Sequence, residues 1–393
     1  MAILCYGRTV KFDYAGWLQG QDEDVLAIAS VQLANQDKYK LVKRVLDLND
    51  GPLIDRIALE LSRNFPISRV IAHSEYDLLR AARLREFLGL NGQTVEGAIA
   101  YRDKVVMKRY LERAGIAVAH ADRLTEPLDA ISFVSKHGYP VVLKPTDGAG
   151  SHDVVIAKSE SEVWDALTML RPGASAIETY VEGTMYHVNG LIAGSNVKFF
   201  APCAYINGAL DFRLGKVFGS KTLHPASSLA RRLVKFTGQV IDALPQSDVL
   251  AFHAEIFLTP KDELVLCEIA SRTAGSLTIE LIERSYGVNL HRSWVKAQAG
   301  IDHEMTQAEF QGVLAASLRV PVREQRLADL PLTVPFPWVS TVCLTGRPGH
   351  EHTKASTYTD DVLSAIIVGS TDEQLSLRIT EYVDWLDTHV RWE

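Results

Sequence analysis

Short apolar runs and helical patterns of apolar positions alternate over the first hundred residues. The runs at residues 2–6 and 70–72 are typical of buried strands. After the second run, apolar side chains recur at three- and four-residue steps over residues 78–88, which predicts the inner face of a helix ending at Gly89. No GxGxxG sequence follows the first run, so a dinucleotide site is not supported. We expect an α/β unit over residues 1–100 that serves as a scaffold with part of a substrate wall.

Strand and helix patterns continue through the rest of the chain. Residues 252–258 and 264–269 flank the turn-forming residues 259–263 and predict a β-hairpin. An amphipathic helix is predicted over residues 373–386, in a C-terminal unit that begins near residue 305. Further helices are expected over residues 103–114, 128–137, 160–170 and 227–244. Further strands are expected over residues 141–143, 153–157, 186–192 and 197–205, whereas the less informative part after residue 305 contains apolar runs at residues 312–320 and 362–368.

Composition and charge narrow the class of protein. A chain of 393 residues is too long for one compact core, and 47% hydrophobic with 23% charged residues is ordinary globular usage. The formal net charge of −7 argues against a nucleic-acid partner bound through phosphate contacts. The cysteines lack zinc-site spacing, and their small number fits a reducing compartment. Since no apolar segment approaches 18 residues, we expect a cytoplasmic protein with no membrane partner.

A lysine and a glycine loop follow the strand predicted over residues 141–143. Lys144 ends that strand, and Gly148 and Gly150 allow backbone conformations that expose N–H groups to an anion. The loop lacks the GxxxxGK[ST] pattern of a Walker A loop. A phosphate cradle and a plain hairpin turn are both compatible with this stretch.

A second stretch with possible chemistry covers residues 178–183. Glu178 follows the apolar pair at residues 176–177. A strand that leads into an extended linker can offer backbone groups to a flat base such as adenine, with a carboxylate nearby for an exocyclic amine. The alternative is a solvated strand end, which these residues alone favour.

Two glutamates are predicted to face each other across the hairpin. A turn centred between Lys261 and Asp262 places Glu255 opposite Glu268, with His253 on the same face as Glu255. Opposed carboxylates with Cβ atoms about 5 Å apart destabilise a sheet and raise each other's pKa unless a cation lies between them. Two carboxylates and nucleotide phosphates suit Mg²⁺, which keeps part of its water shell. An exposed hairpin with solvated charges is the alternative, but these strands are too apolar to expose both faces.

Arg272 follows Glu268 by four residues. A guanidinium just past a metal-binding carboxylate is suited to hold a developing phosphoryl group or a tetrahedral oxyanion. Gly275 would let the backbone approach a ligand closely.

The order of these pieces resembles the ATP-grasp superfamily over about residues 60–300. The pieces are Arg102-Asp103-Lys104, Lys144 with its glycine loop, residues 178–181, Glu255, and Glu268 with Arg272. Residues 252–275 are especially similar to ligases that make dipeptides and related amides, the L-amino acid ligase type. The resemblance implies an α/β (α+β) ATP-grasp fold with three parts. These are an N-terminal Rossmann-like domain at residues 1–100, an ATP-grasp domain at 101–304 with a small lid at about 116–177, and a C-terminal subdomain at 305–393 that completes the core.

The resemblance also implies cofactors and roles. ATP and one or two Mg²⁺ ions, or Mn²⁺, are the implied cofactors, with Glu255 and Glu268 holding the metal. Arg272 and Lys144 are the implied catalytic residues. ATP contacts are implied for Lys104, Lys144, Gly148, Gly150, Ser151, Glu178, Val181 and Glu182. Candidate substrate contacts are His187, His253, Ser271 and Gly275.

The sequence departs from the common family pattern at two positions. Ala270 stands where many members carry an asparagine two residues after the second metal glutamate. Met185 stands where an acidic residue often holds the ribose, and Glu182 is the candidate substitute. Both departures leave part of the ligand set open.

The activity that the resemblance implies is amide formation between a small-molecule carboxylate and an amine, through an acyl-phosphate. The amino-acid-like nature of both substrates is part of this expectation, and the C-terminal unit is a candidate homodimer surface. The alternatives are another ATP-grasp chemistry, such as a carboxylase or a purine-pathway-type ligase, and a non-catalytic ATP-binding regulatory protein.

Overall fold

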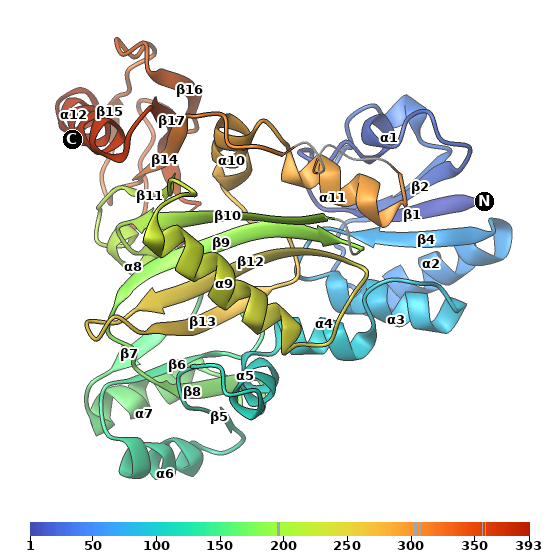
Figure 1. Ribbon diagram of the computed structural model, residues 1–393, viewed down its shortest axis with the longest axis horizontal. Coiled ribbons are helices and arrows are strands. Elements are labelled where there is room, and N and C mark those ends of the chain that lie inside the picture. Colours follow the sequence, from blue (N-terminus) through green and yellow to red (C-terminus); the bar gives the residue numbers. More distant parts are fainter. Residues whose placement is uncertain (195–196, 302–304, 306–307, 356, 358) are drawn as a thin grey trace.

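The computed structural model describes residues 1–194, 197–301, 305, 308–355, 357 and 359–393. Its N-terminal part is a parallel sheet in the order β3-β2-β1-β4 (Figure 1). Strands β1 and β2 are buried along almost their whole length, as their near-continuous apolar sequences require in a sheet covered on both faces. The strands are β1 Ala2–Gly7, β2 Asp24–Ala29, β3 Leu41–Arg44 and β4 Ile67–Ala72.

Helices cover both faces of this sheet. Helices α2 (Gly51–Asn64) and α3 (Leu78–Leu88) pack on one face. Helices α1 (Tyr14–Trp17) and α11 (Leu290–Gln298) pack on the other. The predicted bounds of α3 are confirmed, and Gly89 ends the helix in the left-handed conformation with φ of 67°. A short 3₁₀ helix, η1 (Gln36–Lys38), lies between β2 and β3.

A second, smaller antiparallel sheet follows, in the order β5-β8-β6-β7. Helices α4 (Val95–Arg102) and α5 (Lys104–Arg113) lead into it. Helices α6 (Pro127–His137) and α7 (Glu160–Met169) pack against it around Phe133, Leu143 and Ile177. The strands are β5 Ala121–Leu124, β6 Val141–Pro145, β7 Val155–Ala157 and β8 Ser175–Thr179.

The largest sheet has eight strands in the order β13-β12-β9-β10-β11-β14-β17-β16. Strands from both sides of residue 305 therefore share one sheet. The predicted domain limits stay predictions, and the limit at residue 304 lies outside the described residues. The strands are β9 Thr184–Ala193, β10 Val197–Ile206, β11 Phe218–Thr222, β12 Val249–Leu258, β13 Leu264–Ala270, β14 Leu314–Pro321, β16 Val339–Leu344 and β17 Asp361–Gly369. The helices associated with it are α8 Ala209–Phe212, α9 Ser228–Asp242, α10 Thr278–Tyr286 and α12 Asp372–His389, and β15 Leu327–Asp329 pairs with β18 Arg391–Trp392.

Helix α9 fixes which face of β12 can carry chemistry. It lies across β9 and β12 and buries Leu233 and Val240 against Phe252 and Ala254 (Figure 1). Because side chains alternate across a strand, Glu255 projects from the opposite face, toward the small sheet. The apolar alternation of β12 thus orients the acidic residue.

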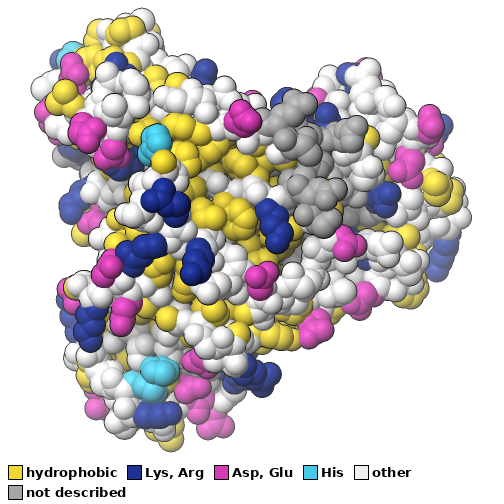
Figure 2. Space-filling view, in the orientation of Figure 1, with side chains coloured by type: hydrophobic (Ala, Val, Ile, Leu, Met, Phe, Trp, Pro, Cys, Tyr) yellow, Lys and Arg dark blue, Asp and Glu magenta, His cyan; other side chains and the backbone are white. Residues whose placement is uncertain are grey.

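The surface shows no dominant charge in the view of Figure 2. Acidic and basic side chains are both spread over this face, around a central apolar area. Among the described residues, no helix has the length and apolar character needed to cross a membrane.

Candidate active site

The hairpin places Glu255 opposite Glu268, as predicted, but by a different register. Near the turn, Thr259 pairs with Glu263 through a backbone hydrogen bond, and Ile256 pairs with Leu266. That register alone would set Glu255 against the residue before Glu268. A β-bulge next to Glu255 shifts the pairing by one residue and brings the two glutamates together. The predicted turn centre is therefore wrong, because Asp262 adopts a left-handed conformation (φ 62°) that closes a three-residue turn.

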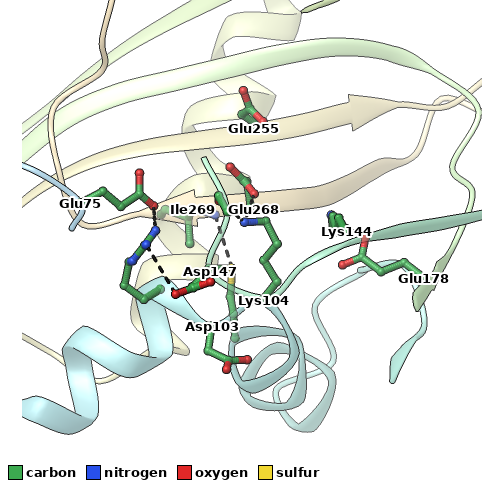
Figure 3. Close-up of polar contacts among 12 residues, drawn as sticks. Glu75, Asp103, Lys104, Lys144, Asp147, Glu178, Glu255, Glu268 and Ile269 are labelled. Carbon is green, nitrogen blue, oxygen red and sulfur yellow. Dashed lines mark hydrogen bonds and ion pairs between the residues drawn. The ribbon is translucent and has the colours of Figure 1, made fainter. Parts of the chain in front are cut away.

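Each of the opposed glutamates has its own polar partner. Lys104 Nζ lies 2.9 Å from Glu268 Oε2 and also donates to the Gly148 carbonyl at 2.7 Å (Figure 3). The Tyr205 hydroxyl donates to Glu255 Oε1 at 2.5 Å. Burial raises the pKa of the Glu268 carboxyl, but Lys104 and Lys144 outweigh it, so this pKa lies below its usual value.

The pKa of Glu255 is also lowered. Burial raises it, but the His253 ring and the Tyr205 hydroxyl outweigh burial and the neighbouring Glu268. Both carboxyls are therefore ionised at neutral pH. Two ionised, opposed and partly buried carboxylates form an oxygen-donor pair of the kind that holds a divalent cation.

A three-charge cluster lies next to these glutamates. The Glu178 carboxylate is 2.7 Å from Lys108 Nζ through one oxygen and 2.7 Å from Lys144 Nζ through the other. All three side chains are buried. Burial raises the pKa of Glu178, but the two lysines outweigh it and lower that pKa to about 2. Burial lowers the pKa of Lys108, whereas Glu178 outweighs burial and raises that of Lys144.

Arg272 reaches the same region from the segment after β13. Its Nε donates to Glu75 Oε2 at 2.8 Å, and its Nη1 donates to the Thr273 carbonyl at 3.1 Å. Glu75 belongs to the N-terminal part of the chain, just beyond β4. The other oxygen of Glu75 lies 2.8 Å from Nη1 of Arg102.

The glycine loop between β6 and β7 is held from two sides. The Gly148 carbonyl accepts from Lys104, and the Ser151 carbonyl accepts from Arg213 at 2.6 Å. Gly150 and Ser151 have positive φ values of 68° and 57°. These contacts orient the loop over the lysines.

One cavity of about 550 Å³ collects most of the predicted site residues. It extends from the small sheet, past the opposed glutamates, to the segment after β13. The predicted residues that line it are Lys104, Lys144, Gly148, Gly150, Ser151, Glu178, Val181, His253, Glu255, Glu268, Arg272 and Gly275. Tyr205, Phe218 and Ser220 line the end beyond the glutamates.

Three predicted residues do not line this cavity. Glu182 is exposed beside it, and Ser271 is buried with its hydroxyl 3.3 Å from Gln93 Oε1. His187 is fully buried and shares hydrogen bonds with Ser220 and Asn189. Their proposed ribose and substrate contacts stay predictions.

A buried hydrogen-bond chain supports His253. Asn189 Nδ2 lies 2.9 Å from His187 Nδ1, and Asn189 Oδ1 lies 2.8 Å from His253 Nδ1. Because the amide nitrogen donates and its oxygen accepts, Nδ1 of His253 is the donor in its contact with Asn189. Its Nε2 then faces Glu255, 3.6 Å from Oε1.

Sequence reasoning missed Lys108, Glu75 and Tyr205. Lys108 carried a usable signal, since it lies one helical turn after Lys104 on the buried side of α5. Glu75 and Tyr205 carried none, because their partners are distant in sequence.

A family model of the ATP-grasp domain matches residues 101–276. The chain contains an ATP-grasp domain. The match confirms the predicted ATP-grasp family and fold for residues 101–276, and the cavity lies mostly within these residues.

Relatives of known function share this domain. The L-arginine-specific L-amino acid ligase of Bacillus subtilis is 25% identical over 276 residues, covering 68% of this chain and 66% of that protein. The alanine–anticapsin ligase of Bacillus subtilis is 26% identical over 251 residues, covering 58% and 52%. The chain thus spans only half to two thirds of the length of these relatives.

Solved structures share the whole fold. The L-amino acid ligase from Bacillus licheniformis has a TM-score of 0.77 at 15% identity, covering 100% of this chain and 98% of that chain. The phosphoribosylglycinamide synthetase from Anaerococcus prevotii has a TM-score of 0.70 at 13% identity, covering 100% and 99%. At these identities the likeness concerns the fold alone.

Proposed function

We propose that this protein is an ATP-dependent carboxylate–amine ligase that forms an amide bond through an acyl-phosphate and releases ADP and phosphate. One observation carries the proposal. A single cavity is lined by two ionised, opposed glutamates, three buried lysines, a glycine loop and Arg272. The names of the Bacillus subtilis relatives support amino-acid-like substrates.

The residues present fit a magnesium site. Glu255 and Glu268 offer ionised oxygen donors on one face of the hairpin. Among the described residues, no cluster of three acidic, histidine or cysteine side chains could hold a metal alone. This donor set suits Mg²⁺, which commonly takes one or two carboxylates together with phosphate and water oxygens. When bound there, Mg²⁺ would offset phosphate charge during phosphoryl transfer.

The lysines and the glycine loop bind and orient the nucleotide in this proposal. Lys104 and Lys144 bring positive charge to the phosphates, and both have carboxylate partners that hold them in place. The loop around Gly150 offers backbone N–H groups and covers the phosphates, which excludes water from the acyl-phosphate. Glu178 would lie near the adenine while its carboxylate holds the lysines.

Arg272 stabilises charge at the reacting carboxyl. In the first step a substrate carboxylate attacks the γ-phosphate, and ADP leaves. In the second step an amine attacks the acyl carbon and phosphate leaves. A tetrahedral oxyanion forms after the amine attacks and before phosphate leaves, and the Arg272 guanidinium, held by Glu75, would stabilise it. No protein nucleophile is required.

Product analysis tests the proposal. Purified protein with ATP, Mg²⁺ and mixtures of amino acids should yield ADP, phosphate and an amide detectable by mass spectrometry. Glu268→Gln should abolish turnover while the protein stays folded, because it removes one charge of the opposed pair. Glu263→Gln, an exposed position of the same hairpin, is the matched control and should retain full activity. Formation of AMP and pyrophosphate would refute the acyl-phosphate route.

The same assay separates the alternatives. Phosphate release that depends on bicarbonate, without an amide product, would indicate a carboxylase-type reaction. Tight ATP binding without turnover over a broad substrate panel would indicate a regulatory ATP-binding protein.

A further inference from the structure

Glu75 connects the N-terminal part of the chain to the catalytic arginine. The residue follows β4, and its side chain is only 11% exposed. Its two oxygens are divided between two guanidinium groups. Oε2 accepts from Arg272 Nε, and Oε1 lies 2.8 Å from Arg102 Nη1. Arg102 also contacts Asp147, whose Oδ2 lies 3.9 Å from Arg102 Nη2; Glu75 and Asp147 are both labelled in Figure 3.

The contact with Glu75 fixes the plane of the Arg272 guanidinium. A guanidinium is rigid and planar, so two contacts to different nitrogens define its orientation. Glu75 takes Nε, and the Thr273 carbonyl takes Nη1. The side chain of Arg272 lines the cavity next to Glu268, so a rotation of this plane would move donors at the reacting centre.

Glu75 also offsets the repulsion between two guanidinium groups that lie close together. Arg102 and Arg272 meet on one carboxylate, and both side chains are largely buried, at 10% and 18% exposure. Burial raises the pKa of Glu75, but Arg272, Arg102 and Lys104 outweigh it and lower this pKa to about 2. The carboxylate therefore stays charged at any working pH. Without that charge the two guanidinium groups would repel each other and separate.

We propose that Glu75 is a positioning residue for the ligase reaction, acting through the orientation of Arg272. The inference rests on the proposed function. It makes the N-terminal part of the chain, predicted as a scaffold with part of a substrate wall, a contributor to the orientation of Arg272. A purely structural role would predict loss of stability, with no selective effect on the chemical steps.

Three variants test this inference: Glu75→Gln, Glu75→Asp and the control Glu60→Gln, an exposed glutamate of α2 in the same part of the chain. Glu75→Gln should lower kcat at least tenfold, because complete removal of an oxyanion donor lowers kcat by a factor of about 10²–10³. The KM for ATP should change less than twofold, since Lys104 and Lys144 keep their contacts. The ratio of phosphate released to amide formed should rise above one, because a poorly held acyl-phosphate is lost to water.

If Glu75→Gln fails to fold, Glu75→Asp still tests the proposal, because it keeps the negative charge between the two guanidinium groups. The shortened side chain retracts the carboxylate from Arg272, so kcat should stay at least fivefold below the parent value. Full recovery of kcat in Glu75→Asp would overturn the proposal, since charge alone would then suffice. In an Arg272→Lys background, Glu75→Gln should have almost no further effect on kcat; an additive loss would equally overturn it.

Failure of the proposal can be told from failure of the proposed function. A parent protein that forms no amide refutes the ligase function and this inference with it. An active parent with an equally active Glu75→Gln variant refutes the inference alone.

Discussion

Replacing Lys108 with methionine removes one of the two ammonium groups that hold the Glu178 carboxylate. Lys108 Nζ lies 2.7 Å from Glu178 Oε1, and its side chain is 2% exposed. Removing one partner of a buried ion pair typically costs about 3–5 kcal/mol. Here Lys144 still contacts Glu178, and burial of the Lys108 charge is relieved, so both effects reduce the loss.

The pKa of Glu178 gives a second estimate of this loss. The net fall from 4.5 to about 2 corresponds to about 3 kcal/mol, which remains after the effect of the two lysines has overcome the opposing effect of burial. We expect Lys108→Met to lower the free energy of unfolding by about 2 kcal/mol. The KM for ATP should rise several-fold, because Lys144 would then be the only cation on Glu178 and would bind phosphate less well.

Urea unfolding at pH 7.5 measures the stability effect. Lys136→Met is the control, because Lys136 is exposed on α6 and should change stability by less than 0.5 kcal/mol, as is usual for surface positions. In the double variant Lys108→Met/Glu178→Gln, the loss should be smaller than the sum of the single losses. Strict additivity, or a loss from Lys108→Met below about 0.5 kcal/mol, would refute the treatment of these charges as one cluster.

Three further predictions concern packing, acid stability and the metal. Gly190→Ala should destabilise the protein by about 3 kcal/mol in urea unfolding, because the added Cβ would lie 2.1 Å from the Phe199 carbonyl oxygen. The control Gly238→Ala, in the middle of α9 where the added Cβ meets no other atom, should stabilise the protein by up to about 1 kcal/mol. Burial and nearby charges lower the pKa of His73 and His291 to about 3, so the unfolded chain gains protons first as pH falls below about 6.5. The free energy of unfolding should therefore fall by about 1 kcal/mol per histidine between pH 7.5 and 5.5. This fall should be smaller in the His291→Gln variant, and an equal fall in variant and parent would contradict the role given to His291. ATP should raise the Tm more with Mg²⁺ than with a chelator, and equal shifts would argue against a metal at the opposed glutamates.

Local sequence patterns predicted many of the helices and strands. Helix α3 and its end at Gly89 were predictable, because apolar period and a left-handed glycine act within a few residues. Strand β2 was missed, although its apolar residues 25–29 form a run of the same kind as those that predicted β1 and β4. Helices α10 and α11 were also missed, although both carry buried apolar residues.

The opposed glutamates show how a correct prediction can follow from an incomplete argument. The side-chain alternation of β12 and β13 predicts that Glu255 and Glu268 share a face. A bulge and a left-handed residue at Asp262 change the register twice, and the two changes cancel at the glutamates. Neither feature is encoded in the apolar pattern.

The partners of the site residues could not be predicted. Arg272 and Glu75 are separated by 197 positions, and Tyr205 and Glu255 by 50. The second pair depends on the strand order within the eight-stranded sheet, and the first on how the N-terminal part of the chain packs against that sheet; periodicity predicts neither. Lys108 differs, because its distance from Lys104 along α5 would have allowed its prediction.

The transfer of oxygen from substrate to phosphate tests the central claim most directly. Amino acids labelled with ¹⁸O in the carboxyl group, ATP, Mg²⁺ and the protein would be incubated, and the released phosphate analysed by mass spectrometry. An acyl-phosphate route predicts one ¹⁸O atom in phosphate for each amide formed, together with ADP. Unlabelled phosphate, or label recovered in AMP, would contradict the account.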